Sequence, residues 1–106
     1  NGHMPQEVKE QILPLVLENY KSHTRQSMND IVKVDSSLAA MQFMLVAKQY
    51  GYDTNPIGGF EHEEIGKTFG YDLDRYVPVM IVAIGKKAKG AYNSYRMPVE
   101  KVLEYK

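Results

Sequence analysis

The spacing of apolar residues near the N-terminus predicts a first helix. A rough helical rhythm runs through Glu7, Val8, Ile12, Leu15 and Val16. Pro5 suits the first position of such a helix, because the N–H that proline lacks would be unpaired there in any case. Pro14 lies inside the pattern and is expected to kink or split the helix.

A second and longer helix is predicted to begin near Ser27 or Asp30, after a polar connection over residues 21–27. It is expected to run to Tyr50, with Gly51 as its C-terminal cap. Its second half, LAAMQFMLVAKQY, is apolar on nearly every side. A helix of that kind is buried on all sides, so in a chain this short it is expected to need a partner.

The rest of the pattern predicts shorter elements. Residues 52–55 fit a short strand, and a third helix is expected from about residue 62 to residue 69, where Gly70 ends it. Residues 77–85 are rich in β-branched side chains and do not alternate, which indicates an interior strand covered on both faces. A polar loop follows, and the weakly alternating residues 98–105 predict an edge strand or an arm.

Composition narrows the class of protein. The 106 residues fit one small domain or half of a larger one, and 13 basic and 13 acidic residues leave no net field to attract nucleic acid or anionic membrane. The absence of cysteine excludes disulfides and thiol chemistry. Without a membrane-spanning run or a secretion signal, a cytoplasmic protein is expected. Residues 1–4 resemble a tag remnant or a truncated native linker, which leaves residues 5–106 as the folded part.

The adjacent glycines Gly58 and Gly59 are the first candidate site. They precede a predicted helix start in which Phe60 and Ile65 can form a hydrophobic staple around Glu61 as N-cap. Two interpretations are open. The pair can be a strand-to-helix turn that needs positive φ, which is the commoner use of Gly-Gly. Alternatively, the backbone N–H groups, unshielded by side chains, can donate to the acceptor edge of a planar ligand.

The second candidate site is the segment Ser94-Tyr95-Arg96, because an arginine fork with a nearby hydroxyl suits a phosphate group. Such a segment on a polar loop is more often simply solvated, and so are the lysines at 86, 87 and 89. His62 beside two glutamates is not expected to bind metal, since adjacent helical positions point in different directions. No phosphate-loop, dinucleotide-binding or hydrolase motif is present, and no side chain is an obvious nucleophile or general base.

Several segments together resemble the C-terminal half of the FMN-dependent nitroreductase family. They are DSSLAAMQFMLVAKQYGYDTNPIGGF, YVPVMIVAIGKKA and SYRMP, in that order. Each segment alone is weak evidence, but their order and spacing are specific. The resemblance covers about residues 30–106 and implies an α+β fold, a nitroreductase-like α/β sandwich of which this chain is the C-terminal half. That half would contain a long buried helix, a glycine turn, a short helix, an interior strand and a C-terminal arm.

The resemblance also implies a site and an assembly. Family members are homodimers with FMN at the subunit interface and a swapped C-terminal arm, and the long apolar helix belongs to the dimer core. By position, Gly58 and Gly59 would face N5 and O4 of the flavin through their amides, with Pro56 and Ile57 beside the ring. The residues that would bind the FMN phosphate are Ser94 and Arg96. No metal site is implied.

The sequence departs from the family pattern in two places. Glu61 stands where family members usually carry a shorter acid as helix cap, and the longer side chain is a poorer cap. More seriously, the family's N-terminal half, with its arginine-rich phosphate motif and its cation near N1 and O2 of the flavin, has no counterpart in these residues. We therefore expect a fragment that is inactive alone and that needs the missing half of the domain.

The resemblance implies an oxidoreductase that transfers hydride or electrons from NAD(P)H through FMN to a nitroaromatic, quinone or similar small-molecule acceptor. It does not distinguish NADH from NADPH. Relatives with dehalogenating or flavin-fragmenting chemistry keep the fold and change the reaction. From the residues alone, a different class remains open: a non-enzymatic α/β interaction or dimerisation module whose apolar helix binds a partner without any cofactor.

Overall fold

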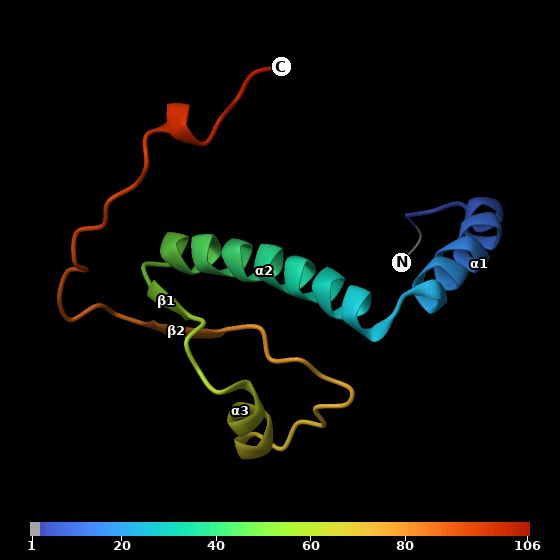
Figure 1. Ribbon diagram of the computed structural model, residues 1–106, viewed down its shortest axis with the longest axis horizontal. Coiled ribbons are helices and arrows are strands. Elements are labelled where there is room, and N and C mark those ends of the chain that lie inside the picture. Colours follow the sequence, from blue (N-terminus) through green and yellow to red (C-terminus); the bar gives the residue numbers. More distant parts are fainter. Residues whose placement is uncertain (1–2) are drawn as a thin grey trace.

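The computed structural model describes residues 3–106 and has a mixed α+β fold (Figure 1). Its elements, in chain order, are α1 (Gln6–Ser22), α2 (Arg25–Gln49), β1 (Asp53–Ile57), α3 (His62–Thr68), β2 (Ile81–Gly85) and a 3₁₀ turn (Val99–Lys101). The order agrees with the fold expected from the sequence. The differences lie at the ends of elements and in how much of the chain is buried.

The first helix is continuous through Pro14, so the expected split is wrong. Proline removes the N–H that would donate to the carbonyl of Glu10. No residue of α1 is buried, so water can hydrate that carbonyl and the helix continues. Pro5 is the N-cap and not the first helical residue, and its carbonyl accepts from the N–H of Lys9 at 3.0 Å.

The second helix begins earlier than predicted because Thr24 caps it. The Thr24 hydroxyl accepts a hydrogen bond from the Ser27 N–H at 3.2 Å, and the Thr24 carbonyl accepts from the Met28 N–H at 2.9 Å. A threonine in this position satisfies one of the unpaired donors of the first turn. The segment between α1 and α2 is therefore shorter than the polar connection expected from composition.

The C-terminal end of α2 is as predicted. Gly51 has φ 81°, the left-handed conformation that glycine adopts most easily. The Gly51 N–H donates to the Lys48 carbonyl and the Tyr52 N–H donates to the Ala47 carbonyl, both at 3.0 Å. These two bonds form a Schellman motif, which satisfies carbonyls of the last turn and directs the chain into β1.

The sheet has two strands within the described residues. β1 and β2 pair antiparallel, with Asp53 opposite Gly85 and Ile57 opposite Ile81. β1 extends beyond the predicted strand to include Pro56, which an edge strand tolerates. β2 is shorter than residues 77–85, has one neighbouring strand and contains no buried residue, so this chain covers neither its second edge nor both of its faces. Coverage as an interior strand requires further polypeptide.

The third helix ends in a second Schellman motif. Gly70 has φ 70°, its N–H donates to the Lys67 carbonyl at 3.2 Å, and the Tyr71 N–H donates to the Gly66 carbonyl at 2.8 Å. Gly66 is buried against Leu73, and a Cβ added there would lie 2.8 Å from Leu73 Cγ. The glycine therefore lets the following loop fold back closely on the helix.

The C-terminal segment extends away from the rest of the chain as an arm (Figure 1). Residues 86–98 have no strand or helix, and residues 99–101 form a single 3₁₀ turn. Of the two expectations for this end, the edge strand is wrong and the arm is correct. The alternation in residues 98–105 is too weak to specify a strand without a neighbour to pair with.

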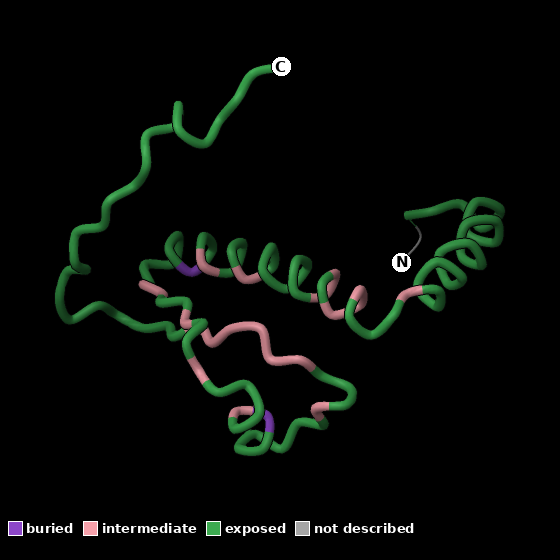
Figure 2. The backbone as a smooth tube through the Cα atoms, viewed as in Figure 1, coloured by how far each residue is buried: buried purple, intermediate pink, exposed green. Residues whose placement is uncertain are grey.

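Very little of this chain is buried (Figure 2). Ala47 is the buried apolar side chain among residues 3–106, while Met41, Phe43 and Leu45 of α2 remain 50%, 48% and 57% exposed. The accessible surface is 9867 Å², whereas a compact protein of this mass exposes about 6,000 Å². The radius of gyration is 19.2 Å, against about 13 Å for a compact domain. The single chain therefore does not cover the helix that the sequence predicts to be buried.

Candidate functional site

The glycine pair lies between the end of β1 and the start of α3, and both residues are exposed. The Phe60 N–H donates to the Gly58 carbonyl at 3.1 Å, so the chain turns tightly here. The N–H groups of Gly58 and Gly59 themselves donate to no described residue. Two adjacent backbone donors are thus available at the surface.

The pair does lie in a turn between strand and helix, but the positive φ expected of that turn is absent. The glycines with positive φ in the described chain are Gly51 and Gly70, and neither Gly58 nor Gly59 is among them. A Cβ added at either position would meet no atom within 4 Å. Neither backbone conformation nor packing inside this chain therefore requires glycine at these two positions. A molecule outside the chain that approaches the backbone closely would require it.

The helix start that follows the pair is held by contacts of its aromatic residues. Glu61 is the N-cap and makes no side-chain capping bond, which is the weaker capping expected of glutamate. The rings of Phe60 and His62 lie 4.5 Å apart, and His62 Nδ1 lies 2.9 Å from the Pro78 carbonyl, to which its N–H donates. His62 thus connects α3 to the segment before β2. No cluster of three metal-ligating side chains occurs in residues 3–106.

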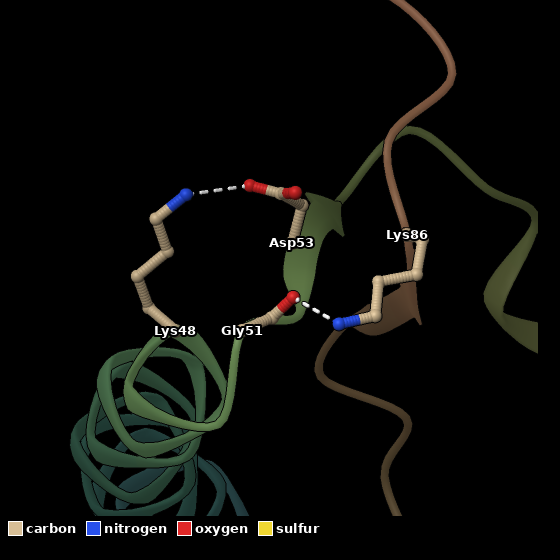
Figure 3. Close-up of polar contacts among 4 residues, drawn as sticks. All are labelled: Lys48, Gly51, Asp53 and Lys86. Carbon is tan, nitrogen blue, oxygen red and sulfur yellow. Dashed lines mark hydrogen bonds and ion pairs between the residues drawn. The ribbon is translucent and has the colours of Figure 1, made fainter.

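The other end of the β1–β2 ladder is held by two lysines (Figure 3). Lys48 Nζ lies 2.7 Å from the Asp53 carboxylate, and Lys86 Nζ donates to the Gly51 carbonyl at 2.8 Å. Lys86 Nζ also lies 4.6 Å from the ring centre of Tyr52, within cation–π range. The hydrogen bond from Lys48 is the main reason that the pKa of Asp53 is lowered from 3.8, and Lys87 contributes.

Sequence reasoning missed this cluster. It treated the lysines after β2 as a solvated exit, which fits Lys89, for which the described chain has no hydrogen bond or ion pair. The contact of Lys86 with the Gly51 carbonyl joins residues 35 positions apart, and no local pattern reveals it. The pairing of the two strands was the available signal. Because β2 ends opposite the first residue of β1, the lysine that follows β2 lies close to the C-terminal end of α2.

The predicted phosphate residues lie on the arm. Ser94 and Arg96 are exposed, and Arg96 Nη1 donates to the Tyr95 carbonyl at 3.2 Å. The arm leaves the ladder after Gly85, which pairs with the first residue of β1, whereas the glycine pair follows the last residue of β1. The two parts of the candidate site therefore begin at opposite ends of the ladder and are not brought together within this chain (Figure 1).

Two hollows lie near the ladder, and neither is lined by the predicted site residues Gly58, Gly59, Ser94 or Arg96. An apolar groove of about 350 Å³ lies between α3 and residues 76–81. A more open hollow of about 690 Å³ lies at the Gly85 end and is bordered by the lysines at 86, 87 and 89. The glycine amides thus face an open surface. A ligand there needs a second wall from other polypeptide.

An α+β chain with free glycine amides beside a short ladder fits the flavoprotein class to which the sequence points, and comparison with known proteins identifies the family. The Nitroreductase family model matches residues 6–86. This chain belongs to the nitroreductase family.

Three relatives show how far the likeness extends. A Bacillus subtilis protein named as an NAD(P)H nitroreductase, YdgI, is 45% identical over 99% of this chain and 50% of its own length. A Staphylococcus epidermidis structure described as an NAD(P)H:FMN oxidoreductase is 55% identical, with a TM-score of 0.92 over 96% of this chain and 48% of its own. A nitroreductase of Exiguobacterium sibiricum, solved in complex with FMN, is 44% identical, with a TM-score of 0.93 over 99% of this chain and 50% of its own.

The chain therefore spans about half the length of the relatives it matches. Both predictions about family and fold class are confirmed, including the expectation that the similarity is to one half of that fold. One solved structure similar to this chain, the Exiguobacterium sibiricum nitroreductase, contains FMN. Among residues 3–106, no helix has the length and hydropathy needed to cross a membrane.

Proposed function

We propose that this chain supplies one edge of the FMN site in an NAD(P)H-dependent oxidoreductase. The observation that carries the proposal is the pair of exposed, unbonded N–H groups at Gly58 and Gly59, where the chain itself has no need of glycine. FMN, when bound, supplies the redox chemistry: it accepts hydride from NAD(P)H and passes electrons to the acceptor. The residues of this chain bind and orient it.

The glycine pair suits the acceptor edge of the flavin ring, N5 and O4. Backbone N–H groups aimed at atoms that gain negative charge stabilise that charge, and preorganised donors need no rearrangement to do so. A side chain at either position would occupy the space that the ring needs. Pro56 and Ile57, the last residues of β1, offer apolar surface beside the same edge.

Arg96 and Ser94 suit the phosphate of the same cofactor. The Arg96 side chain is exposed on the arm with one weak contact to the neighbouring carbonyl, so its guanidinium is free to bind a phosphate. FMN is an elongated molecule whose phosphate lies at the end of its ribityl chain, far from N5. Separation of the two parts of the site is therefore compatible with one ligand, provided that a further polypeptide segment orders the arm.

The same proposal includes an assembly. The chain exposes about 4,000 Å² more than a compact protein of its mass, and obligate subunit interfaces bury about 2,000–5,000 Å² summed over both partners, or about 1,000–2,500 Å² on each. We assign this excess to the remaining part of the domain and to a second copy in a homodimer. The electron acceptor is a nitroaromatic, a quinone or a similar small molecule, and the reaction takes place in the cytoplasm.

The exposed apolar face of α2 also favours a second candidate, an interaction module without a cofactor. The two candidates differ in a simple observable. The enzyme purifies with a flavin absorption band and oxidises NAD(P)H. The interaction module purifies colourless and does neither.

Gly59→Val in the full-length protein tests the glycine contact. Because a Cβ at Gly59 meets nothing inside the chain, the variant should fold normally and lose FMN by steric blocking. Gly90→Val is the matched control, since Gly90 also has open space around its missing Cβ and lies outside the site. FMN content per protomer and the far-ultraviolet circular dichroism spectrum are measured for both variants. Normal FMN occupancy in Gly59→Val would rule out the contact.

A further inference from the structure

The proposed FMN contacts of the glycine pair and the arm do not involve Lys86, and they do not explain its position. It is the first residue after β2, and its side chain turns back to the corner where α2 gives way to β1 (Figure 3). There the ammonium group donates to the Gly51 carbonyl at 2.8 Å and lies 4.6 Å from the centre of the Tyr52 ring. One side chain thus contacts two successive residues of the corner.

The corner is built around this ammonium group. Gly51 is in the left-handed conformation, φ 81°, and a Cβ on it would lie 3.2 Å from Lys86 Nζ. The Schellman motif satisfies the carbonyls of Ala47 and Lys48 but not that of Gly51, which Lys86 binds. A charged donor to a carbonyl is stronger than a neutral one. Lys86 is therefore the donor that satisfies the remaining carbonyl of the corner, that of Gly51.

The corner determines where the glycine pair lies. β1 begins two residues after Gly51, has five residues, and is followed at once by Gly58. Its length is about 17 Å at about 3.3–3.4 Å per residue. A tilt of about 3° at the corner then moves the glycine amides by about 1 Å, and displacements of that size can lower a rate about 100-fold. Small changes at the corner are thus amplified at the far end of the strand.

We propose that Lys86 is a positioning residue for the flavin edge: by holding the Gly51 carbonyl and the Tyr52 ring, it sets the direction of β1 and so places the N–H groups of Gly58 and Gly59. This inference rests on the proposed function for its consequence in catalysis. Its structural part, the coupling of Lys86 to the two glycine amides, is independent of which ligand binds there.

Other cations near the corner do not duplicate this role. Lys48 binds the Asp53 carboxylate on the other side of the strand, and this pair is exposed, with 67% and 33% of the two side chains accessible. Exposed ion pairs of this kind contribute little. Lys89 borders the same hollow as Lys86 and has no hydrogen bond or ion pair among the described residues. Lys89 is therefore the matched control.

The test compares Lys86→Met with Lys89→Met and Lys86→Arg in the full-length protein. Methionine keeps most of the length of the stem and removes the charge, and arginine restores a charged donor. Amide chemical shifts of Gly58 and Gly59 are measured by NMR without FMN, and the flavin absorption spectrum, midpoint potential, kcat and KM are measured with FMN. If Lys86→Met does not fold, Tyr52→Leu, which removes the aromatic contact and leaves the carbonyl bond, is measured in its place.

We expect Lys86→Met to shift both glycine amides, to change the flavin spectrum and potential, and to lower kcat at least tenfold at nearly unchanged KM. Lys86→Arg should recover part of each effect, and Lys89→Met should match the wild type. If Lys86→Met lowers the Tm but leaves the amide chemical shifts of the two glycines and the flavin spectrum unchanged, the proposal is overturned. Lys86 would then contribute to stability only. If Lys86→Met shifts the glycine amides but the wild-type protein binds no FMN, the coupling is supported and the proposed function is refuted.

Discussion

The middle of the chain, from α2 to β2, differs from its two ends in how it satisfies its own backbone. Both helices of the middle end in Schellman motifs at glycines with positive φ, and β1 pairs with β2 along its whole length. Arg25 at the start of α2 donates to the Leu73 carbonyl at 2.9 Å, and Lys86 binds the corner after α2. The middle therefore has polar contacts between segments that are distant in sequence.

Within residues 3–106, the two ends have no comparable polar contacts with segments distant in sequence. α1 contains no buried residue, and the arm exposes several large side chains. Those side chains include Tyr92, Tyr95 and Tyr105, which are 91%, 81% and 89% exposed. The contrast teaches that hydrogen bonding can define the path of a chain before its apolar surface is covered. We propose that other polypeptide covers that surface.

The largest effect is expected when the chain is taken alone. Residues 5–106 expressed by themselves should bind no FMN and oxidise no NAD(P)H, because the flavin would lack its second wall and a cation at the N1–O2 edge. The measurement is FMN binding with NAD(P)H oxidation, alone and after co-expression with the rest of the full-length protein. Bound flavin and steady turnover from residues 5–106 alone would contradict the proposed assembly.

The next largest effect concerns the uncovered face of α2. Leu45 is 57% exposed in the single chain, where glutamate would be tolerated. If the face is covered in the assembly, Leu45→Glu buries an unpaired charge and costs several kcal/mol. The full-length variant should be aggregated or unfolded in size-exclusion chromatography, and Met41→Glu should behave likewise.

Ser36→Glu is the control for this prediction, because Ser36 is an exposed polar residue of the same helix. It should remain folded with the wild-type elution volume. A soluble, folded monomer from Leu45→Glu would show that no partner covers this face.

A smaller effect is expected at the arm. Arg96→Ala should weaken FMN binding by about 1.5–3 kcal/mol, the range for hydrogen bonds to charged groups, or about 10–150-fold in Kd. Riboflavin, which has no phosphate, should bind the variant and the wild type nearly equally. Lys101→Ala, further along the arm, is the control. Equal weakening of FMN and riboflavin would assign Arg96 a different role.

The smallest effect is a pH-dependent one at the corner. The pKa of Asp53 is lowered in the folded chain, chiefly by its bond to Lys48, so its contribution to stability is present above the ordinary value of 3.8. That contribution is lost as the pH falls through the lowered pKa. Asp53→Asn should slightly reduce Tm at neutral pH, and the difference in Tm should disappear once the pH is below the lowered pKa, because protonated aspartate and asparagine are both uncharged. A difference in Tm that persists in acid would assign it to another cause.

Much of the fold follows from local signals in the sequence. Gly51 and Gly70 were identified as helix ends because a left-handed residue is needed there and glycine adopts it without strain. The Thr24 cap was missed because a polar segment contains several residues able to cap, and only hydrogen bonding selects one. The length of β2 was overestimated, since a run of β-branched residues becomes a strand only where a neighbour pairs with it.

The candidate site likewise has features that the sequence reveals and features that only the structure reveals. The glycine pair and Arg96 are recognisable in the sequence, because their residue types and spacing resemble a known family. Their backbone conformation, their hydrogen bonding and the space around them cannot be read from the sequence. The tertiary structure is what shows that neither glycine has positive φ and that both have free N–H groups and open space, and so removes positive φ as the reason for glycine here.

Local chemistry in the sequence was enough to specify the order of elements, the glycine caps and the family, because each depends on residues within a few positions of one another. Tertiary structure alone decided which lysine contacts the corner between α2 and β1 and that the two parts of the candidate site begin at opposite ends of the ladder. It also decided how much apolar surface remains exposed. The physical reason is range. A cap or a turn is a contact between neighbours, whereas the Lys86–Gly51 bond and the burial of α2 depend on segments that only folding, or a second chain, brings together.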